Sequence, residues 1–274
     1  MLLSFFLKSL FICTLMNCLS VHSGPAEAEN HLKGLFHELS EAREAVEREI
    51  ISQNIKDVLE TVLKREDSYE YPFDSLDALG RIASADNRLR VFTWNYSDSP
   101  VDHSYFGFLQ YRPAEDDTIS LFFLDHNKTF DKKEFDNLTF SPENWYGALY
   151  YQIHEVTHEG NTLYTLIGFD FNDVFTNIKL IDALSFTNDS PVFGTPVFQF
   201  KDGIRNRVIF EYSSKVVMMV RYVPAMDMII YDHLSPGSPR LKGLYRYYGP
   251  DFSYDGLRFV NGRWIHQQDV EWSP

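Results

Sequence analysis

The stretch ALYYQIHEVTHEGNTLYTLIGFD, residues 148–170, decides the fold. Two runs rich in Val, Ile, Leu, Phe and Tyr, 148–156 and 162–170, flank the turn residues Glu159-Gly160-Asn161. Aromatic and β-branched residues favour strands, and a short glycine-containing turn between two such runs favours antiparallel pairing. The stretch therefore predicts a β-hairpin.

Similar runs continue on both sides of this hairpin, separated by short turn clusters. Strands are predicted over 89–96, 104–112, 118–124, 179–186, 192–200, 207–212, 216–222 and 226–231. Asn261-Gly262 predicts a further hairpin, because this pair readily adopts the positive φ angles of a type I′ turn. Residues 234–256 are rich in proline and glycine and are predicted to be mostly loop. Short connections favour an antiparallel meander, and a barrel, a sandwich or a propeller-like sheet fits this spacing equally well.

The segment 24–70 has a helical pattern instead. Apolar residues from Leu32 to Leu63 recur at steps of three and four, and no proline occurs between Ala26 and Glu70. We expect one long amphipathic helix, or two helices with Ser40 as a cap between them. The apolar stripe is expected to pack on the β domain, and a coiled coil with a partner helix is the alternative.

Residues 1–23 have the pattern of a secretory signal peptide. Lys8 is their only charge, and the apolar core is too short to span a bilayer comfortably. Cleavage after Ser23 would remove Cys13 and Cys18, the only cysteines of the chain. A lipoprotein in which Cys18 is acylated is the alternative. The predicted organisation is signal peptide 1–23, helical segment 24–70 and β domain 71–274.

The 274-residue chain has a formal net charge of −14. A charge of this sign argues against nucleic acid and against anionic lipid surfaces, because no basic stripe along the sequence would release counterions. No second apolar stretch is long enough to predict a transmembrane helix after the signal. The phosphate-binding glycine loops and the G-x-S-x-G nucleophile motif do not occur, and we expect no cofactor.

One motif suggests a metal. His154-Glu155-Val156-Thr157-His158 matches HExxH, which binds zinc when a helix places both imidazoles on one face. Here the motif lies in the predicted hairpin, where residues four apart are about 13 Å from each other. His154 and His158 are therefore candidate ligands in an unsuitable context, and a solvated hairpin tip is the expected structure.

A second candidate site combines tyrosines with carboxylates. Tyr248, Asp251, Tyr254 and Asp255 lie close together in the sequence. Aromatic faces stack on sugar rings and carboxylates accept hydroxyl hydrogen bonds, so this cluster predicts a glycan site. The alternative is that the rings pack on the core.

Several segments carry a resemblance to a known family. They are WYGALYY (145–151), YTLIGFD (164–170), RVIFEY (207–212), YDHL (231–234), YGPDFSYDG (248–256) and NGRW (261–264). Over residues 70–272 the chain resembles a family of uncharacterised exported proteins of Bacteroidetes-type bacteria. The resemblance implies export to the periplasm, the outer membrane or the exterior, and it implies no activity.

Together these features favour an exported, non-enzymatic binding or structural protein that contacts a protein or a glycan through its β domain. A hydrolase, either dependent on zinc at His154 and His158 or based on carboxylates, is the alternative.

Overall fold

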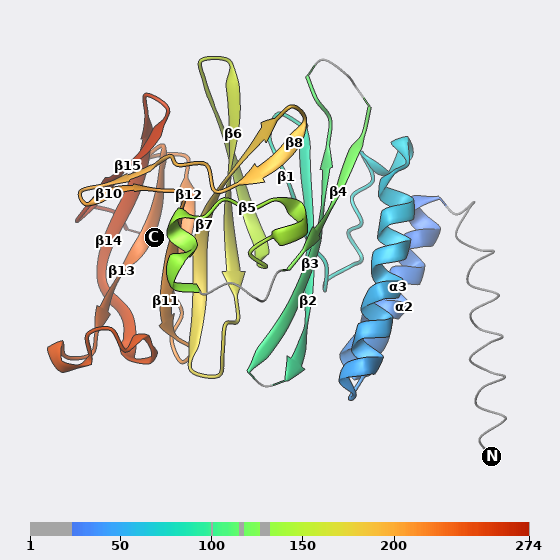
Figure 1. Ribbon diagram of the computed structural model, residues 1–274, viewed down its shortest axis with the longest axis horizontal. Coiled ribbons are helices and arrows are strands. Elements are labelled where there is room, and N and C mark those ends of the chain that lie inside the picture. Colours follow the sequence, from blue (N-terminus) through green and yellow to red (C-terminus); the bar gives the residue numbers. More distant parts are fainter. Residues whose placement is uncertain (1–23, 100, 115–117, 127–131, 274) are drawn as a thin grey trace.

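The computed structural model describes residues 24–99, 101–114, 118–126 and 132–273. The predicted signal peptide, with Cys13 and Cys18, lies outside the described residues. Two helices and three stacked sheets form four layers, with the helices covering one outer face (Figure 1). The prediction of a mainly β chain with antiparallel sheets and an N-terminal helical segment is confirmed. The sheets stack face to face, so the architecture is a layered sandwich.

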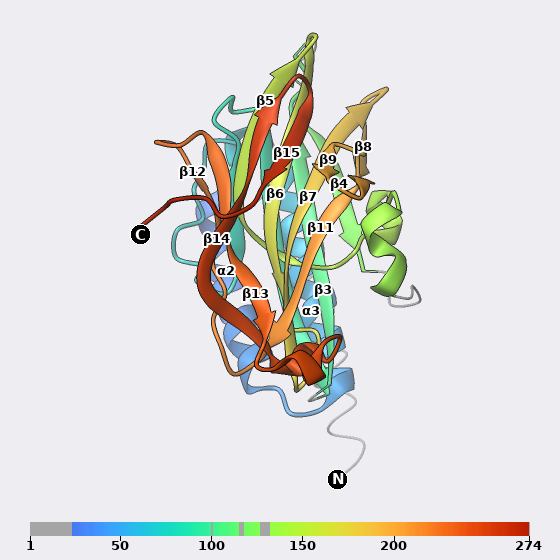
Figure 2. The same ribbon diagram turned by 90° about the vertical axis from the view of Figure 1, so that its left-hand side faces the viewer.

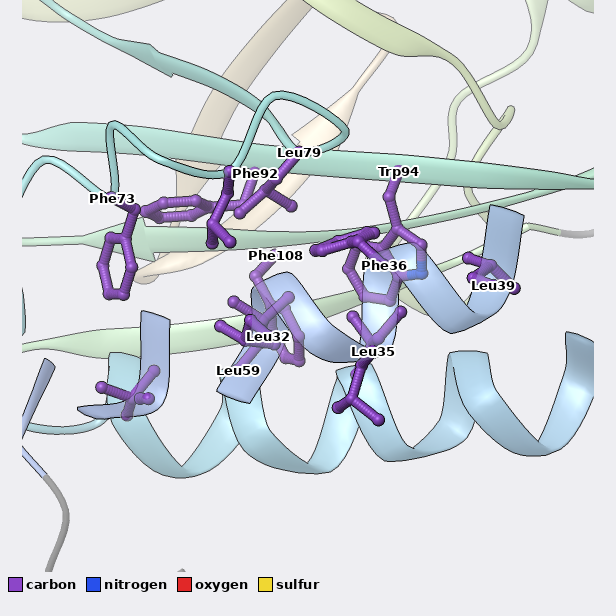
Figure 3. Packing of buried hydrophobic residues seen from close by; sticks show 14 of the residues in the cluster. Leu32, Leu35, Phe36, Leu39, Leu59, Phe73, Leu79, Phe92, Trp94 and Phe108 are labelled. Carbon is purple, nitrogen blue, oxygen red and sulfur yellow. The ribbon is translucent and has the colours of Figure 1, made fainter. Parts of the chain in front are cut away.

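The helical layer consists of α2 (Pro25–Glu41) and α3 (Ala45–Leu63). Two helices are therefore present, and the chain breaks between them at Ala42, whose backbone is extended. The expectation that Ser40 caps the second helix is wrong, because its hydroxyl donates back to the carbonyl of His37 within α2. The apolar stripe of both helices packs on the first sheet, as expected (Figure 3).

The first sheet has the order β1-β2-β3-β4 and is antiparallel throughout. Its strands are β1 (Gly80–Ala83), β2 (Leu89–Ser99), β3 (Asp102–Tyr111) and β4 (Ser120–Asp125). Alternate residues point to opposite faces of a strand. Phe92, Trp94 and Phe108 accordingly face the helices, while Tyr105 and Leu109 pack towards the second sheet.

The second sheet lies in the middle of the stack and has the order β11-β7-β6-β5, with β8 also paired to β7. The strands are β5 (Leu149–His158), β6 (Asn161–Asp170), β7 (Thr176–Thr187), β8 (Ser190–Phe193) and β11 (Arg207–Ser213). The predicted hairpin is confirmed as β5–β6, with Glu159 and Gly160 at positive φ. Because both faces of this sheet are covered, β6 and β7 contain continuous buried runs.

The third sheet has the order β10-β9-β15-β14-β13-β12. Its strands are β9 (Phe198–Phe200), β10 (Gly203–Arg205), β12 (Val220–Val223), β13 (Met228–Pro236), β14 (Tyr248–Val260) and β15 (Arg263–Gln267). The pairing of β15 with β9 is parallel, which departs from a simple meander. The Asn261-Gly262 hairpin between β14 and β15 is confirmed, with φ values of 49° and 80°.

Three of the sequence-based boundaries are wrong by several residues. The strand expected over 216–222 begins only at Val220, as β12, because residues 214–219 form a turn and an irregular connection. The strand expected over 192–200 divides into β8 and β9, which belong to different sheets, and Gly194 turns the chain between them with φ +86°. The segment 234–256 is not mostly loop, because Ser235 pairs with Gly249 and Pro236 with Tyr248. Proline is tolerated at such strand ends and bulges, where a missing N–H removes no central ladder bond. Five short 3₁₀ helices complete the described elements: Glu66–Ser68, Lys132–Asn137, Pro142–Asn144, Pro239–Leu241 and Tyr245–Tyr247.

Candidate functional site

The two histidines of the HExxH motif lie on β5, as the strand pattern of the sequence indicated. His154 stacks on Tyr222, with ring centroids 3.6 Å apart, and meets Trp264 edge-on. Burial lowers the pKa of His154, which favours a neutral ring. His158 lies at the exposed hairpin tip, 3.9 Å from the carboxylate of Glu159. The two rings therefore occupy different environments.

Strand geometry also separates the two histidines by about 13 Å along the chain, which is too far for one zinc ion. Among the residues that the structure describes, no three His, Cys, Asp or Glu side chains gather so that they could hold a metal ion. His154 is instead part of the aromatic packing between the second and third sheets.

The four residues of the predicted glycan site lie on β14, and the structure separates them into two pairs. Asp255 is 6% exposed and accepts hydrogen bonds from His233 Nδ1 at 2.8 Å and from the backbone N–H of Asp269 at 3.1 Å. Tyr254 packs edge-on against Trp272, with ring centroids 4.9 Å apart. Tyr254 and Asp255 thus hold the C-terminal segment against the third sheet.

Tyr248 and Asp251 belong to a different region and stabilise the β13–β14 connection. The Tyr248 hydroxyl accepts a hydrogen bond from the N–H of Gly243 at 2.9 Å. Asp251 accepts hydrogen bonds from the hydroxyls of Ser235 and Ser253, both at 2.7 Å. The four predicted residues therefore do not form one sugar-stacking platform.

Three loops meet at one end of the sandwich, below β11, β13 and the middle sheet in Figures 1 and 2. We call this region the loop end and define it as residues 171–175, 214–217 and 235–252. The hydroxyl and the N–H of Ser214 donate to the carbonyls of Val174 and Phe175, each at 2.9 Å. The Arg246 guanidinium lies 5.9 Å from the ring centre of Phe175. Segments more than 70 residues apart in the sequence thus form one surface.

The loop end exposes an unusual number of large apolar side chains. Phe252 is 93% exposed and Val217 is 87% exposed. The other exposed members are Phe171, Val174, Phe175, Val216, Leu244, Tyr245 and Tyr247. Exposed apolar side chains gathered on neighbouring loops make this region a candidate interaction surface. Sequence reasoning missed these residues apart from Tyr247, which directly precedes the predicted cluster of tyrosines and carboxylates. The tyrosine-, serine- and glycine-rich composition of 235–254 was a signal that could have pointed to the others in this segment.

Local hydrogen bonds fix the shape of the longest of these loops. The N–H of Gly237 donates to the carbonyl of Tyr247 at 3.0 Å, which closes the base of the loop. Within it, Leu244 and Tyr247 each donate to a carbonyl three residues earlier, at 3.0 Å. Arg246 lies over the ring of Tyr247, 4.9 Å from its centre. A surface that is ordered before binding loses less entropy on association.

The charge of this loop is opposite to that of the chain. Residues 235–250 contain Arg240, Lys242 and Arg246 and no acidic residue, which gives a local charge of +3. All three cations are exposed. The surface therefore combines aromatic rings with positive charge on a protein whose net charge is −14.

A separate pocket of about 250 Å³ lies between α3 and the first sheet. Glu49, Lys56, Tyr105 and Asp125 are among its lining residues. The Tyr105 hydroxyl donates to Asp170 at 2.9 Å and accepts from the N–H of Phe171 at 2.8 Å. Burial and then the charge of Asp170 raise the pKa of Tyr105 far above its ordinary range. The hydroxyl is therefore protonated and held in a buried hydrogen-bond network.

In the part of the chain that the structure describes, neither α2 nor α3 is apolar and long enough to cross a membrane. The sequence matches no protein-family model, no curated protein and no solved structure, so the function has to be inferred from the chain's own residues.

Proposed function

We propose that this protein is a non-enzymatic binding protein that docks a protein partner through its loop end. The observation that carries the proposal is the set of exposed aromatic and aliphatic side chains on three hydrogen-bonded loops at one end of a rigid sandwich. Loops placed by a rigid β scaffold are a common position for binding surfaces.

The residue types at the loop end favour a protein partner over a glycan. Val174, Val217 and Leu244 are aliphatic and exposed, and aliphatic side chains do not stack on sugar rings. Tyrosine, phenylalanine and arginine are the residues enriched at protein interfaces and at their energetic hot spots. The composition of 235–254, with four tyrosines, three serines, three glycines and two arginines, is also typical of antibody binding loops.

We further propose that the protein acts after export to the bacterial envelope or exterior. The proposal rests on the apolar N-terminal pattern and on the resemblance to exported proteins of Bacteroidetes-type bacteria. It is also supported by the position of α2, which begins at Pro25, directly after the predicted cleavage site. Mass spectrometry of the purified protein should find Gly24 as the N-terminus, and an intact Met1 would overturn cleavage.

The binding proposal is tested by site-specific photocross-linking in the producing cells. A photoreactive amino acid replaces Tyr247 in one variant and Val260 in another. Both positions are 44% exposed, and Val260 lies at the opposite end of the molecule, in the β14–β15 hairpin. We expect a discrete adduct from position 247 only. Phe175→Asp should abolish that adduct, because it places a charge at the centre of the apolar surface.

Equal adducts from positions 247 and 260, or no adduct from position 247, would contradict the proposal. A glycan array provides the complementary measurement. Glycan binding that disappears with Tyr247→Ala would identify a sugar as the partner and would overturn the assignment of a protein.

A further inference from the structure

The helical layer carries a surface that is complementary to the loop end. We define the helix junction as residues 38–50, which connect α2 to α3. It contains five glutamates and two arginines, which gives a charge of −3, opposite in sign to the +2 of the whole loop end, where Lys215, Arg240, Lys242 and Arg246 outnumber Asp173 and Asp251. Arg48 is directed inward and donates to the carbonyls of Ala42, Arg43 and Ser97, so its charge is partly shielded by its own chain.

The helix junction also has an apolar centre. Val46 is 66% exposed and Ile50 is 58% exposed, one turn apart on α3. Exposed glutamates surround them at positions 44, 47 and 49. The loop end has the corresponding arrangement, with apolar rings beside Lys242 and Arg246. Each surface thus combines exposed apolar side chains with charged ones, and the net charges of the two surfaces are opposite in sign.

Both surfaces lie at the same end of the molecule, on opposite sides of it (Figures 1 and 2). Contacts between the layers connect them. Arg48 of the helix junction reaches Ser97 at the end of β2, and His103 at the start of β3 stacks on Phe171 of the loop end, with ring centroids 4.9 Å apart. A two-fold axis at this end would therefore bring the loop end of each copy against the helix junction of the other. The two identical contacts close the assembly.

We infer that the partner of the loop end is a second copy of this chain, bound through its helix junction in a two-fold symmetric dimer. The inference rests on the proposed function, since it names the partner of the same surface. Charge complementarity would orient the copies, and burial of Val46, Ile50 and the aromatic rings would supply most of the affinity.

The test is sedimentation equilibrium of the purified protein over a range of concentrations, at about 50 mM and about 500 mM salt. We expect a dimer that weakens at high salt. The double variant Lys242→Glu/Arg246→Glu should weaken dimerisation about tenfold, and Glu44→Lys/Glu47→Lys should do the same. Combining all four substitutions should restore the dimer, because the attraction is re-formed with the signs exchanged.

The control variant Lys33→Glu/Lys64→Glu makes the same change in net charge as Lys242→Glu/Arg246→Glu, but at exposed positions in α2 and just after α3, away from the two surfaces. It should change dimerisation less than about twofold, since distant surface charges are screened. Circular dichroism on every variant verifies that it is folded.

Three results would each overturn the inference: a chain that stays monomeric, a dimer whose dissociation constant is unchanged in both charge-reversal variants, or a combined variant that fails to restore the dimer. A monomeric chain that still gives a position-247 adduct with a different protein would overturn the second copy as partner and leave the proposed function standing.

Discussion

Arg207 and Asp182 form a fully buried ion pair between β11 and β7, with Nη2 3.2 Å from Oδ1. Arg207 also donates to the carbonyls of Phe135 and Leu138, at 2.6 and 2.9 Å, which fastens the segment after β4 to the middle sheet. Burial raises the pKa of Asp182 and the Arg207 guanidinium opposes that shift. The pair therefore joins three parts of the chain at one buried point.

We expect Arg207→Ala to lower the free energy of unfolding by about 3–5 kcal/mol, because it leaves Asp182 buried without its counter-charge. Urea denaturation measures the change. The matched control is Arg205→Ala, which removes an ion pair with Asp202 whose carboxylate is 71% exposed. The control substitution should lower the free energy of unfolding by less than about 1 kcal/mol. Equal losses of unfolding free energy in the two variants would show that burial of the Arg207–Asp182 pair does not contribute to stability.

Among the elements, β13, β14 and β15 are joined by one carboxylate. Asp255 on β14 accepts from His233 of β13, lies 3.6 Å from His266 Nε2 of β15, and accepts the N–H of Asp269 in the C-terminal segment. Burial alone would raise the pKa of Asp255, but the nearby His266 and the hydrogen bond from His233 lower it to about 2. The hydrogen bond to Asp255, with the charges of Asp251 and Asp269, raises the pKa of His233.

These shifts predict a pH window for the stability of the third sheet. The His233 contribution is complete below its ordinary pKa of 6.5 and is lost as the pH rises through the raised value. The Asp255 contribution is complete above 3.8 and is lost as the pH falls towards about 2. The pair therefore stabilises most between these limits, by less than about 1 kcal/mol because His233 is 39% exposed.

Urea denaturation at a series of pH values checks this window. His233→Gln should remove the part of the stability that wild type loses above pH 6.5, so the two curves converge as the pH rises. His31→Gln, on the exposed side of α2, is the control and should leave the pH dependence unchanged. Parallel curves for wild type and His233→Gln would contradict the prediction.

For the whole molecule, the helical layer is a structural part of the sandwich. Leu32, Ile55 and Leu59 are fully buried against the aromatic face of the first sheet (Figure 3). Polar contacts add to this packing, since Trp94 Nε1 donates to the hydroxyl of Ser52 at 3.1 Å and Gln110 donates to the carbonyl of Leu63 at 2.7 Å. Without the helices, an outer face of phenylalanine and tryptophan would be open to water.

Leu59→Ala should therefore lower the free energy of unfolding by about 2–5 kcal/mol, because it leaves a cavity between layers that pack closely. Val260→Ala, at a position that is 44% exposed and lies outside both the loop end and the helix junction, should change it by less than about 1 kcal/mol. Chemical denaturation of both variants provides the measurement. A small loss in Leu59→Ala would mean that the helices are docked loosely.

The sequence by itself determined the features that depend on local geometry. Alternating and continuous apolar runs predicted most strands. Glu159-Gly160-Asn161 and Asn261-Gly262 predicted hairpins, because glycine and asparagine adopt positive φ more readily than other residues. The three- and four-residue period predicted the helices, and the β context of His154 and His158 followed from the same patterns.

Only the tertiary structure decided which distant residues meet. Phe175, Val217 and Tyr247 come from three separate loops, and although the composition of 235–254 is typical of a binding loop, no pattern in the sequence indicates that the three loops meet. Asp251 and Asp255 were expected in a loop, but both lie on β14, where residues four apart are about 13 Å from each other, so one bonds Ser235 at the loop end and the other bonds His233. The order in which the sheets stack decides which side chains are buried, which charges pair and which loops form the loop end. That order depends on contacts between residues far apart in the chain.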